Sequence, residues 1–561
     1  MMATLDIRDR VKRTVRSWNP SVLLVNPVKG APGTRGTEAA VAKYAETVAP
    51  SYLYGGFQKT FPSEPLYFQT MAAELRRHRI SCEVVDGYCH RLDLKDLLQV
   101  IKLFQSRIVA FAAFHNTVHD AIRCAAEIKR RDPSVVTVFG SAYASPHWKE
   151  ILDHPEVDYV VVGDGEVAFR ELAEHVLSGM DSSHVAGIAN CRHGVPTLTP
   201  PVPIVDLDAL AFPSRDLAPI VADDGHSLSM YTSRGCAFGK CSFCYLLPYQ
   251  EISLQPLWRA RSPENVVNEL EYLVSEYAVE RVTFVDEDYF GTNGPGVNRA
   301  LEIARLIIER NIRVNYYVNA LVKSLQFVTC QGHLPLLVKS GLDSVFTGFE
   351  STSREVLVSY RKPQRPEHYN ELIDALTTHN IHINPGLITF SRNSTLAEVV
   401  GNVELAQTMK YYDLFLFTRR LVDLGASSID TRSDSMAASE TNAGWLEIYR
   451  RNHDAEAQNF SDLRVASLYQ LMRMLCNLLF EAYQKIGSEN VAHLRSTRDT
   501  LIRAHFLAFY SARDLVCTEN RYLSFEESFS WAQRMTTWIV NRAEPRQDCE
   551  AEQEWLTSEI W

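Results

Sequence analysis

A short segment with three cysteines constrains this chain more than any other feature. Within Arg234–Tyr245 (RGCAFGKCSFCY), Cys236, Cys241 and Cys244 fall inside nine residues, and neither a histidine nor a fourth cysteine stands beside them. Three thiolates suit a soft metal site with one open coordination position, whereas zinc needs a fourth protein ligand or His and carboxylate donors. A [4Fe–4S] cluster takes four ligands, usually thiolates, so three would leave one iron free for a substrate or cofactor. Because cysteine is scarce in this sequence, we favour the cluster over three unrelated cysteines in a turn.

The same segment resembles the cluster loop of the radical S-adenosylmethionine (radical SAM) family. That family usually has C-x3-C-x2-C, and this chain has C-x4-C-x2-C. The second half matches the family well, and the extra residue of the first half falls in a loop whose Gly239 can absorb it. The resemblance implies that the three cysteines ligate a catalytic [4Fe–4S] cluster. It also implies that Phe243 and Tyr245 lie beside S-adenosylmethionine.

Composition limits the class of protein. With 561 residues, the chain is long enough for two to four domains. The formal net charge of −11 argues against a general nucleic-acid binder, whose phosphate contacts need a basic surface. No apolar run approaches the roughly 20 residues of a membrane span, and residues 1–20 form a charged leader unlike a secretory signal. Eleven cysteines without such a signal predict a reducing compartment, and therefore a cytoplasmic protein without a membrane partner.

Apolar runs alternate with helical patterns over residues 21–190. The expected strands are Val22–Asn26, Ser81–Val85, Ile108–Ala113, Val135–Gly140 and Val157–Val162. Five strands that alternate with helices predict an α/β domain with an open, doubly wound, Rossmann-like parallel sheet. In such a sheet the ligand binds beyond the carboxyl ends of the strands.

Two loops at that edge are similar to loops of the cobalamin-binding domain that precedes many radical SAM cores. Family members often have Gly-Gly-x-His after the fourth strand and Gly-Glu-Gly-Glu after the fifth. This chain has Gly140-Ser141-Ala142-Tyr143 and Gly163-Asp164-Gly165-Glu166. The D-x-H-x-x-G motif for a histidine ligand to cobalt is absent, so the resemblance implies base-off cobalamin with water or nothing below the metal. The implied cobalamin contacts are Asn26, His115, Gly140, Ser141, Tyr143, Gly163, Gly165 and Glu166.

Two alternatives to these cobalamin contacts stay open. The whole domain could be a flavodoxin-like sheet that has lost its ligand, since such sheets are common. For His115, Ser141 and Tyr143, packing or loop hydrogen bonding is at least as good an explanation as contact with the corrin.

A proline-rich stretch precedes a second alternation of strands and helices. Six prolines lie between Pro196 and Pro219, and proline fixes φ and removes a donor, so residues 191–226 are predicted to be an extended surface linker. Residues 227–430 show six strand–helix units, which predict a partial (β/α)6 TIM-like barrel with its chemistry at the carboxyl ends of the strands. Radical SAM cores have this form. The expected strands are Ser227–Thr232, Arg281–Val285, Val314–Val318, Ser344–Thr347, Ile383–Thr389 and Leu414–Phe417.

Further elements of the radical SAM pattern follow the strands of this barrel. Asp286-Glu287-Asp288 resembles an acidic run that meets the methionine ammonium, which needs acceptors; solvation of a strand end is the alternative for each carboxylate. The resemblance places Asn319 at the ribose, and it makes Glu350 of Gly348-Phe349-Glu350-Ser351 a cofactor ligand. It also places Ile388 of Pro385-Gly386-Leu387-Ile388 against adenine. Arg361 and Lys362 could meet a carboxylate, although solvated surface is the favoured interpretation for both.

Residues 431–561 lack strand patterns and are predicted to form a helical domain. Apolar residues at helical spacing extend over Leu463–Lys485. Ser496 opens a second helix, and Ser524 with Glu527 opens a third in a capping-box pattern. The aromatic residues of this region are interpreted as the core of a helical cap, and the lining of a substrate cavity is the minority alternative.

The resemblance covers about residues 20–420 and implies an enzyme, a cobalamin-dependent radical SAM C-methyltransferase. A reduced cluster would cleave S-adenosylmethionine to a 5′-deoxyadenosyl radical that takes hydrogen from the substrate, and cobalamin would deliver methyl. The expected substrate is a small molecule of a specialised biosynthetic pathway, and the expected partner is an electron donor such as flavodoxin or ferredoxin. Radical cyclisation or rearrangement, methylation without a substrate radical, and a non-catalytic cobalamin or cluster sensor remain alternatives. The complete cysteine set and the acidic strand end argue against the sensor.

Overall fold

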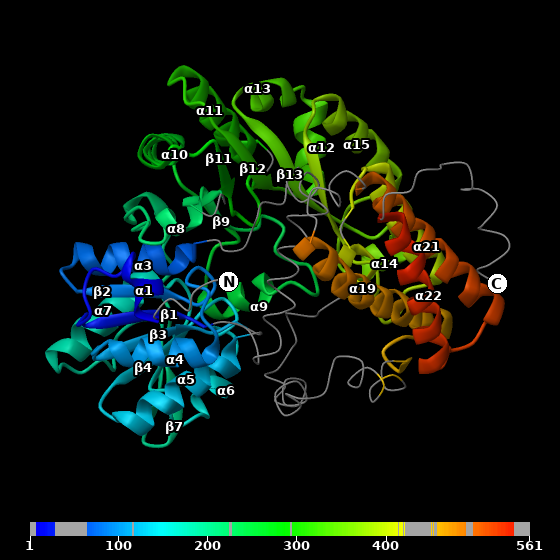
Figure 1. Cartoon of the computed structure of the whole chain (residues 1–561). Coiled ribbons are helices and arrows are strands. Elements are labelled where there is room, and N and C mark those ends of the chain that lie inside the picture. Colours follow the sequence, from blue (N-terminus) through cyan, green and yellow to red (C-terminus); the bar gives the residue numbers. More distant parts are fainter. Residues whose placement is uncertain are drawn as a thin grey trace. The chain divides into compact units, whose positions relative to one another are not determined.

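The chain forms two compact units, each with its own core (Figure 1). The computed structural model describes residues 7–27, 64–114, 117–223, 227–291, 294–412, 414–418, 420, 450, 453, 457–489 and 498–543. Of these, the residues up to Gly386 belong to the first unit and those from Leu387 onward to the second. No helix in these ranges is both long and apolar enough to cross a membrane.

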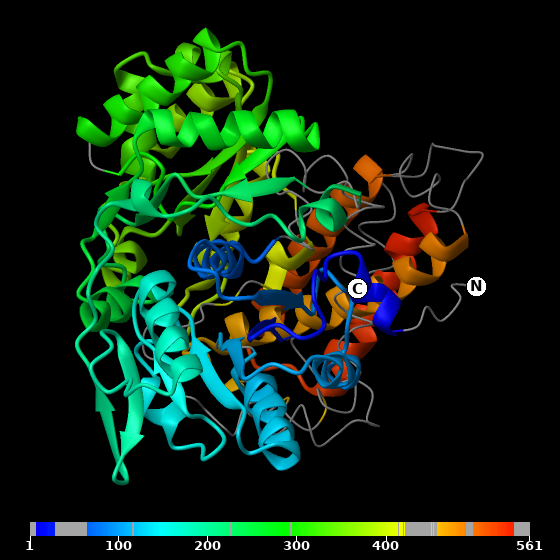
Figure 2. The ribbon, with the colours of Figure 1, turned by 90° about the vertical axis from the view of Figure 1, so that its left-hand side faces the viewer.

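The first unit begins with a seven-stranded sheet in the order β2-β1-β3-β4-β5-β6-β7 (Figure 2). Strands β1 to β5 run parallel, and β6 and β7 add an antiparallel edge. The strands are β1 (Val22–Asn26), β2 (Cys82–Asp86), β3 (Ile108–Ala112), β4 (Val136–Gly140), β5 (Tyr159–Val161), β6 (Ile188–Arg192) and β7 (Val195–Leu198). Every residue of β1, β2 and β3 is buried, because helices cover both faces of a doubly wound sheet. The predicted Rossmann-like domain is confirmed.

Helices connect these strands and form the two outer layers. They are α1 (Ile7–Lys12), α3 (Leu66–Arg77), α4 (Leu94–Leu103), α5 (Val118–Arg131), α6 (Trp148–Leu152) and α7 (Gly165–Ser178). Helices α3 and α7 pack together, while α4 packs against α1 and α5. The strand order reverses at β1. Right-handed crossovers therefore place the helices before and after this point on opposite faces of the sheet.

The predicted linker needs correction in two respects. Strands β6 and β7 carry the first sheet to Leu198, so the segment that joins the two sheets starts after that residue and not at 191. The remainder is also anchored in the core, because the guanidinium of Arg215 is buried and donates to Glu64 at 2.5 Å and to Glu269 at 2.7 Å. The segment contains the helices η1 (Leu207–Ala209) and α8 (Ala218–Asp223). Proline content alone therefore does not make it a surface linker.

The second sheet of the first unit has five strands in the order β14-β13-β12-β11-β8. They are β8 (Leu228–Met230), β11 (Arg281–Phe284), β12 (Asn315–Asn319), β13 (Leu342–Glu350) and β14 (His382–Leu387). The helices of this half are α9 (Leu246–Ser253), α10 (Pro263–Tyr277), α11 (Pro295–Glu309), α12 (Val322–Cys330), α13 (Leu334–Lys339), α14 (Arg354–Ser359), η2 (Pro366–His368) and α15 (Tyr369–Thr378). The predicted α/β partial barrel is confirmed. Its sixth strand, expected at Leu414–Phe417, is instead part of the 3-10 helix η3 (Leu414–Thr418).

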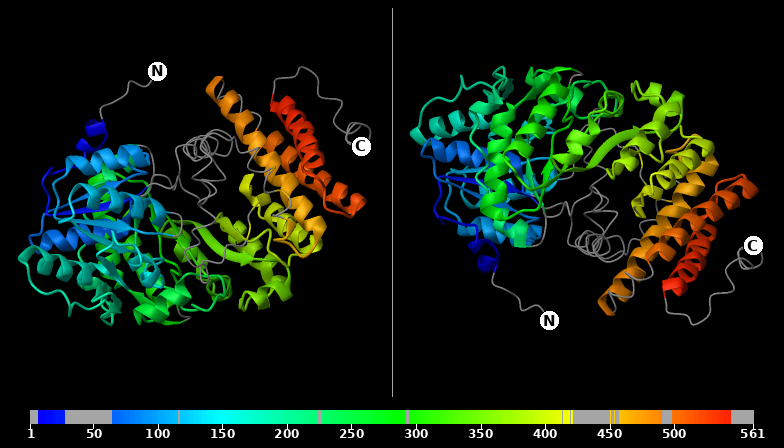
Figure 3. Two further views of the ribbon diagram at one scale, coloured as in Figure 1. Left: turned by 90° about the horizontal axis from the view of Figure 1, so that it is seen from below. Right: turned by 90° about the horizontal axis from the view of Figure 1, so that it is seen from above.

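The second unit is helical (Figure 3). It contains α16 (Leu396–Thr408), η3, α19 (Leu463–Glu489), α21 (Arg498–Glu519) and α22 (Phe525–Ala543). Helix α19 packs against α21, α22 and η3, and Phe417 stacks on Phe509 with ring centroids 5.6 Å apart. Both η3 and α16 contribute to this helical core.

Candidate active site

The cysteine loop begins at the end of a two-stranded antiparallel ribbon. Strand β9 (Ser233–Gly235) pairs antiparallel with β10 (Trp258–Ala260), with Gly235 opposite Trp258. Gly235 has φ +84°, and a Cβ at this position would stand 2.3 Å from the carbonyl oxygen of Leu257. Only glycine fits this backbone without strain, so Gly235 fixes the direction in which the chain leaves the ribbon toward Cys236.

The three cysteines lie on one short loop with restricted access to solvent. Cys236 and Cys241 are buried and Cys244 is half-buried. Burial raises the pKa of Cys236 to about 12 and that of Cys244 to about 11. The thiols are therefore neutral at pH 7 until a metal displaces their protons.

A cluster suits this donor set better than a single ion. In the part of the chain that the structure describes, no three His, Cys, Asp or Glu side chains converge closely enough for one metal ion. A [4Fe–4S] cluster spreads its thiolates over separate irons, so its ligands stand farther apart than those of a mononuclear site. The loop rests on the turn after α14, where the Ser242 amide donates to the Tyr360 carbonyl at 3.2 Å and Phe243 meets the Tyr360 ring at 5.4 Å.

The acidic run after β11 divides into three different environments. Asp286 is buried and accepts from the amides of Thr232 at 2.6 Å and Ser233 at 3.0 Å, so it holds the start of the ribbon. Glu287 accepts from the Gly235 amide at 3.0 Å and from the Tyr245 hydroxyl at 3.1 Å. Glu287 therefore ties both ends of the cysteine loop.

Asp288 differs from its two neighbours. Both of its carboxylate oxygens are buried, and neither makes a well-formed hydrogen bond. Burial raises the pKa of Asp288 to about 7, against the opposing effect of nearby backbone N–H groups. A buried carboxylate whose hydrogen bonds are poorly formed is costly, and this one lies close enough to Cys236 to raise the pKa of that thiol. It fits an ammonium group bound beside the cluster loop.

A buried ion pair lies on the other side of the loop. Glu350 ends β13 with φ +62°, and its carboxylate is 3.0 Å from the ammonium of Lys362. The Lys362 side chain is only 8% exposed. Burial opposes its charge, but the carboxylate of Glu350 outweighs burial and raises the pKa of Lys362. The favoured interpretation of Lys362 as solvated surface is therefore wrong, whereas Arg361 is exposed as expected.

The two remaining residues expected at S-adenosylmethionine lie in different parts of the fold. Asn319 ends β12 at the same sheet edge, where its side-chain amide donates to the Asp286 carbonyl at 2.7 Å. Ile388 lies in the second unit, directly after β14, where its carbonyl accepts from Asn402 at 3.1 Å. Asn319 thus stands beside the acidic run, and Ile388 is a half-buried residue at the start of the second unit.

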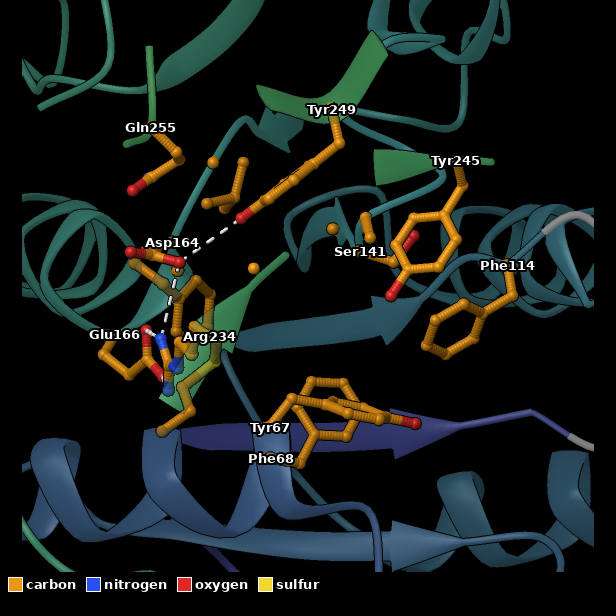
Figure 4. A pocket seen from close by; sticks show the side chains of 18 of the residues that line it. Tyr67, Phe68, Phe114, Ser141, Asp164, Glu166, Arg234, Tyr245, Tyr249 and Gln255 are labelled. Carbon is orange, nitrogen blue, oxygen red and sulfur yellow. Dashed lines mark hydrogen bonds and ion pairs between the residues drawn. The ribbon is translucent and has the colours of Figure 1, made fainter. Parts of the chain in front are cut away.

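A cavity of about 330 Å³ opens at the carboxyl ends of β3, β4 and β5 (Figure 4). Its walls on the sheet side are mostly apolar and include the predicted residues Gly140, Ser141, Gly163, Gly165 and Glu166. At Gly165 a Cβ would stand 2.9 Å from Cε of Met71, so a larger residue would displace the end of that flexible side chain. Glycine-lined loops let the backbone approach a flat ring closely, and the apolar walls beside them suit the face of a macrocycle such as the corrin ring of the predicted cobalamin.

Residues of β9, of the cluster loop, of α9 and of the segments after β8 and β11 line another part of this cavity. They are Tyr231, Arg234, Gly235, Tyr245, Leu246, Tyr249 and Glu287. The expected binding edges of the two halves therefore share one chamber.

Other residues expected at cobalamin have structural partners. The side-chain amide of Asn26 donates to Asp86 at 2.6 Å, and Tyr143 is buried and stacks on His147 at 4.5 Å. Neither of them lines the cavity. The Ser141 hydroxyl donates to the Ala113 carbonyl at 2.5 Å and accepts from two amides of its own loop. His115 lies outside the described residues.

Several lining residues escaped the sequence analysis. Tyr67, Phe68 and Met71 come from α3, and Arg259 comes from β10. Their only signal is position: the helix after β1 borders the edge where such sheets bind ligands. Nothing in the sequence pairs Arg259 with Arg234.

Comparisons with known proteins agree with this geometry. Residues 60–173 match the family model of the B12 binding domain, and residues 230–406 match that of the Radical SAM superfamily. An uncharacterised methyltransferase of Pyrococcus horikoshii is 25% identical over 379 residues, which are 66% of this chain and 76% of that protein. An anaerobic magnesium-protoporphyrin IX monomethyl ester cyclase of Synechocystis sp. is 26% identical over 296 residues, 51% of this chain and 55% of that protein.

Among solved structures, the fold is similar to that of OxsB, described as a cobalamin-dependent S-adenosylmethionine radical enzyme with aqua-cobalamin and S-adenosylmethionine bound. The TM-score is 0.65 at 17% sequence identity, over 93% of this chain and 79% of that one. The two matched domains bring three cofactors, a [4Fe–4S] cluster, S-adenosylmethionine and cobalamin. With both domains in this order, the chain belongs to the cobalamin-dependent radical SAM enzymes and is methyltransferase-like.

Proposed function

We propose that this enzyme transfers a methyl group to carbon in a small-molecule intermediate of specialised metabolism. One observation carries the proposal: the cavity at the cobalamin-binding edge is walled by Tyr245 and Glu287 of the radical SAM half. Methyl transfer requires that the donor and the substrate radical meet in one enclosed space. A shared chamber meets that requirement.

Each polar group around the cluster loop has a role in this proposal. Cys236, Cys241 and Cys244 would hold the cluster. Asp288, whose oxygens have no well-formed partner, would accept the ammonium of S-adenosylmethionine. Lys362 would donate to its carboxylate, because a buried ammonium beside the loop is the matching ion.

The remaining groups orient and shield. Glu350 holds Lys362 in place before the cofactor arrives, and Asn319 would meet the ribose. Glu287 and Tyr245 close the wall between the two cofactor sites. When bound, the cofactors supply one electron, a radical and a methyl group, and the protein contributes alignment and the exclusion of water.

The proposal includes a source of electrons and a compartment. Reductive cleavage of a sulfonium takes one electron per event, so a low-potential donor such as flavodoxin or ferredoxin must deliver it. Buried thiols and a redox-sensitive cluster loop suit the reducing cytoplasm.

A second function is ring closure with the same cofactors. The similarity to a protein named as a cyclase, at 26% identity, favours it. Both reactions begin with hydrogen abstraction, and they differ in whether methyl is consumed.

The test uses anaerobically reconstituted enzyme loaded with cobalamin, given S-adenosylmethionine and titanium(III) citrate. Formation of both 5′-deoxyadenosine and S-adenosylhomocysteine, with the former lost in Cys241→Ala, would support radical methyl transfer. 5′-Deoxyadenosine alone would favour cyclisation or rearrangement, and S-adenosylhomocysteine alone would favour methylation without a substrate radical. Neither product from protein that holds its cluster would refute the proposal.

Lys362→Met, with Arg361→Met as the neighbouring control, separates cofactor binding from folding. The Lys362 variant should keep its iron and bind S-adenosylmethionine at least tenfold more weakly, about 1.4 kcal/mol. The control should match the parent, because Arg361 is exposed. Equal affinity in both variants would remove Lys362 from the site.

A further inference from the structure

The acidic residues of the Gly163-Asp164-Gly165-Glu166 loop line the cavity together with its glycines, but their carboxylates are engaged in ion pairs. Asp164 is the N-cap of α7, but its side chain accepts no hydrogen bond from the helix. An aspartate at this position ordinarily caps its own helix. Here the carboxylate turns instead to the ribbon that carries the cysteine loop (Figure 4).

Four side chains form this contact. Arg234 of β9 lies 2.5 Å from Glu166 and 3.4 Å from Asp164, and Arg259 of β10 lies 2.5 Å from Asp164. The Tyr249 hydroxyl also donates to Asp164 at 3.3 Å. We call Asp164, Glu166, Arg234 and Arg259 the ribbon latch.

The ribbon itself makes the latch necessary. Arg234 and Arg259 are direct cross-strand partners, and like charges in that position repel each other. Asp164 bridges both guanidinium groups. Although burial acts to raise it, Arg234 and Arg259 hold the pKa of Asp164 below its usual value. The carboxylates of Asp164 and Glu166 therefore offset the repulsion between the two guanidinium groups of the ribbon.

Stability alone does not explain four buried charges. The side chains of Asp164, Glu166 and Arg259 are at most 5% exposed, and that of Arg234 is 16% exposed. Desolvation can cancel the attraction within a buried ion pair, and apolar residues often stabilise such sites better. Such pairs are better suited to fixing one arrangement among several.

The arrangement that the latch fixes joins the two cofactor sites. Gly163 and Gly165 flank Asp164 and line the cavity, whereas Arg234 stands two residues before Cys236. We propose that Arg234 and Arg259 are positioning residues that set the cluster loop at a fixed place relative to bound cobalamin. Through them, a ligand that orders the cavity loop also orders the ribbon, which makes the two sites energetically coupled.

This inference rests on the proposed function for its catalytic consequence but not for its binding consequence. Loosening the latch should leave the cysteines, Asp288 and Lys362 arranged as before relative to one another, and should change only their position relative to cobalamin. The enzyme should then still cleave S-adenosylmethionine reductively, while transfer of its methyl group to cobalamin, which releases S-adenosylhomocysteine, should become slow. Loss of structure would instead lower both products together.

The experiment is a double-mutant cycle of Glu166→Gln, Arg234→Gln and the double variant, with Arg234→Lys as the conservative change. The first readout is the dissociation constant of aqua-cobalamin, measured by absorbance in protein of equal iron content. The second is the ratio of S-adenosylhomocysteine to 5′-deoxyadenosine. Arg305→Gln on α11 is the control, because its ion pair with Glu302 lies on the surface.

Each single variant should weaken aqua-cobalamin binding about tenfold or more. The double variant should be little worse than either, since both remove the same contact. The product ratio should fall in parallel, with Arg234→Lys intermediate. Additive losses of affinity would mean that Glu166 touches cobalamin directly and would overturn the proposal, as would unchanged affinity and ratio. If the parent releases no S-adenosylhomocysteine, the proposed function fails, and the binding cycle alone decides the latch.

Discussion

The replacement Gly235→Ala tests whether the backbone at the end of the ribbon determines cluster binding. Gly235 has φ +84°, where an L-residue costs about 1–2 kcal/mol. The added Cβ would also stand 2.3 Å from the Leu257 oxygen. To reach ordinary contact at 3.4 Å, the backbone of Leu257 must move by about 1 Å, and overpacking of this kind costs roughly 1–3 kcal/mol.

The penalty falls on the segment that presents Cys236. A loss of about 3 kcal/mol in loop order corresponds to roughly 100-fold weaker cluster binding. Iron and sulfide content after anaerobic reconstitution, with the electron paramagnetic resonance spectrum of the reduced protein, should therefore fall far below those of the parent. The melting temperature of the cluster-free protein should change much less, because the ribbon is a small part of the first unit.

Gly332→Ala is the matched control. Gly332 also has positive φ, at +69°, but a Cβ there meets nothing within 4 Å. It should cost only about 1 kcal/mol of stability and leave cluster content unchanged. A Gly235→Ala protein with the parent's iron content and spectrum would refute the reasoning, because the loop path would then not depend on this residue.

Three further predictions concern stability. Arg215→Met leaves two buried carboxylates without their cation and should cost about 3–5 kcal/mol in guanidinium unfolding, whereas Arg77→Met, at an exposed site, should stay within about 0.5 kcal/mol. Ser524→Ala removes a capping box in which Ser524 and Glu527 exchange hydrogen bonds. The free energy of opening at the start of α22, measured by hydrogen exchange, should therefore fall by about 1 kcal/mol. Burial lowers the pKa of His505 to about 3 from 6.5. The folded second unit therefore holds His505 neutral, and its free energy of unfolding should be highest above pH 6.5 and should decrease as the pH falls toward 3. Thermal unfolding of His505→Gln should depend less on pH across that window.

Regular elements were predictable from sequence wherever the local pattern was sufficient to determine them. Strand β1 has the predicted bounds, Val22–Asn26, because a short continuous apolar run that ends at a turn is a purely local pattern. The capping box at Ser524 is likewise local and is present. The cysteine loop and the glycine loops were predictable because their function requires cysteines or glycines at a fixed spacing, which the sequence shows directly.

Long-range partners account for the errors. Leu414–Phe417 has the composition of a strand, but its neighbours are the helices of the second unit, and it forms η3. The proline content predicts surface chain, yet Arg215 anchors the segment between carboxylates that are 151 and 54 positions away. Its neighbour Asp216 also pairs with Arg16 and Arg76. Lys362 was judged by charge, which favours the surface, whereas its partner Glu350 makes burial possible.

The acidic run Asp286-Glu287-Asp288 explains why sites are harder to predict than folds. Sequence reading treats the three carboxylates as one motif with one role. In the structure, Asp286 accepts hydrogen bonds at the start of the ribbon, and Glu287 lies in the wall of the cavity. Asp288 has no well-formed hydrogen bond. The three carboxylates differ in the amides and hydroxyls that their oxygens meet, and those donors come from Thr232 after β8, from β9 and from the cysteine loop. A residue's chemistry at this edge is therefore decided by what the other strands bring to it, so function at the site depends on the register of the whole sheet.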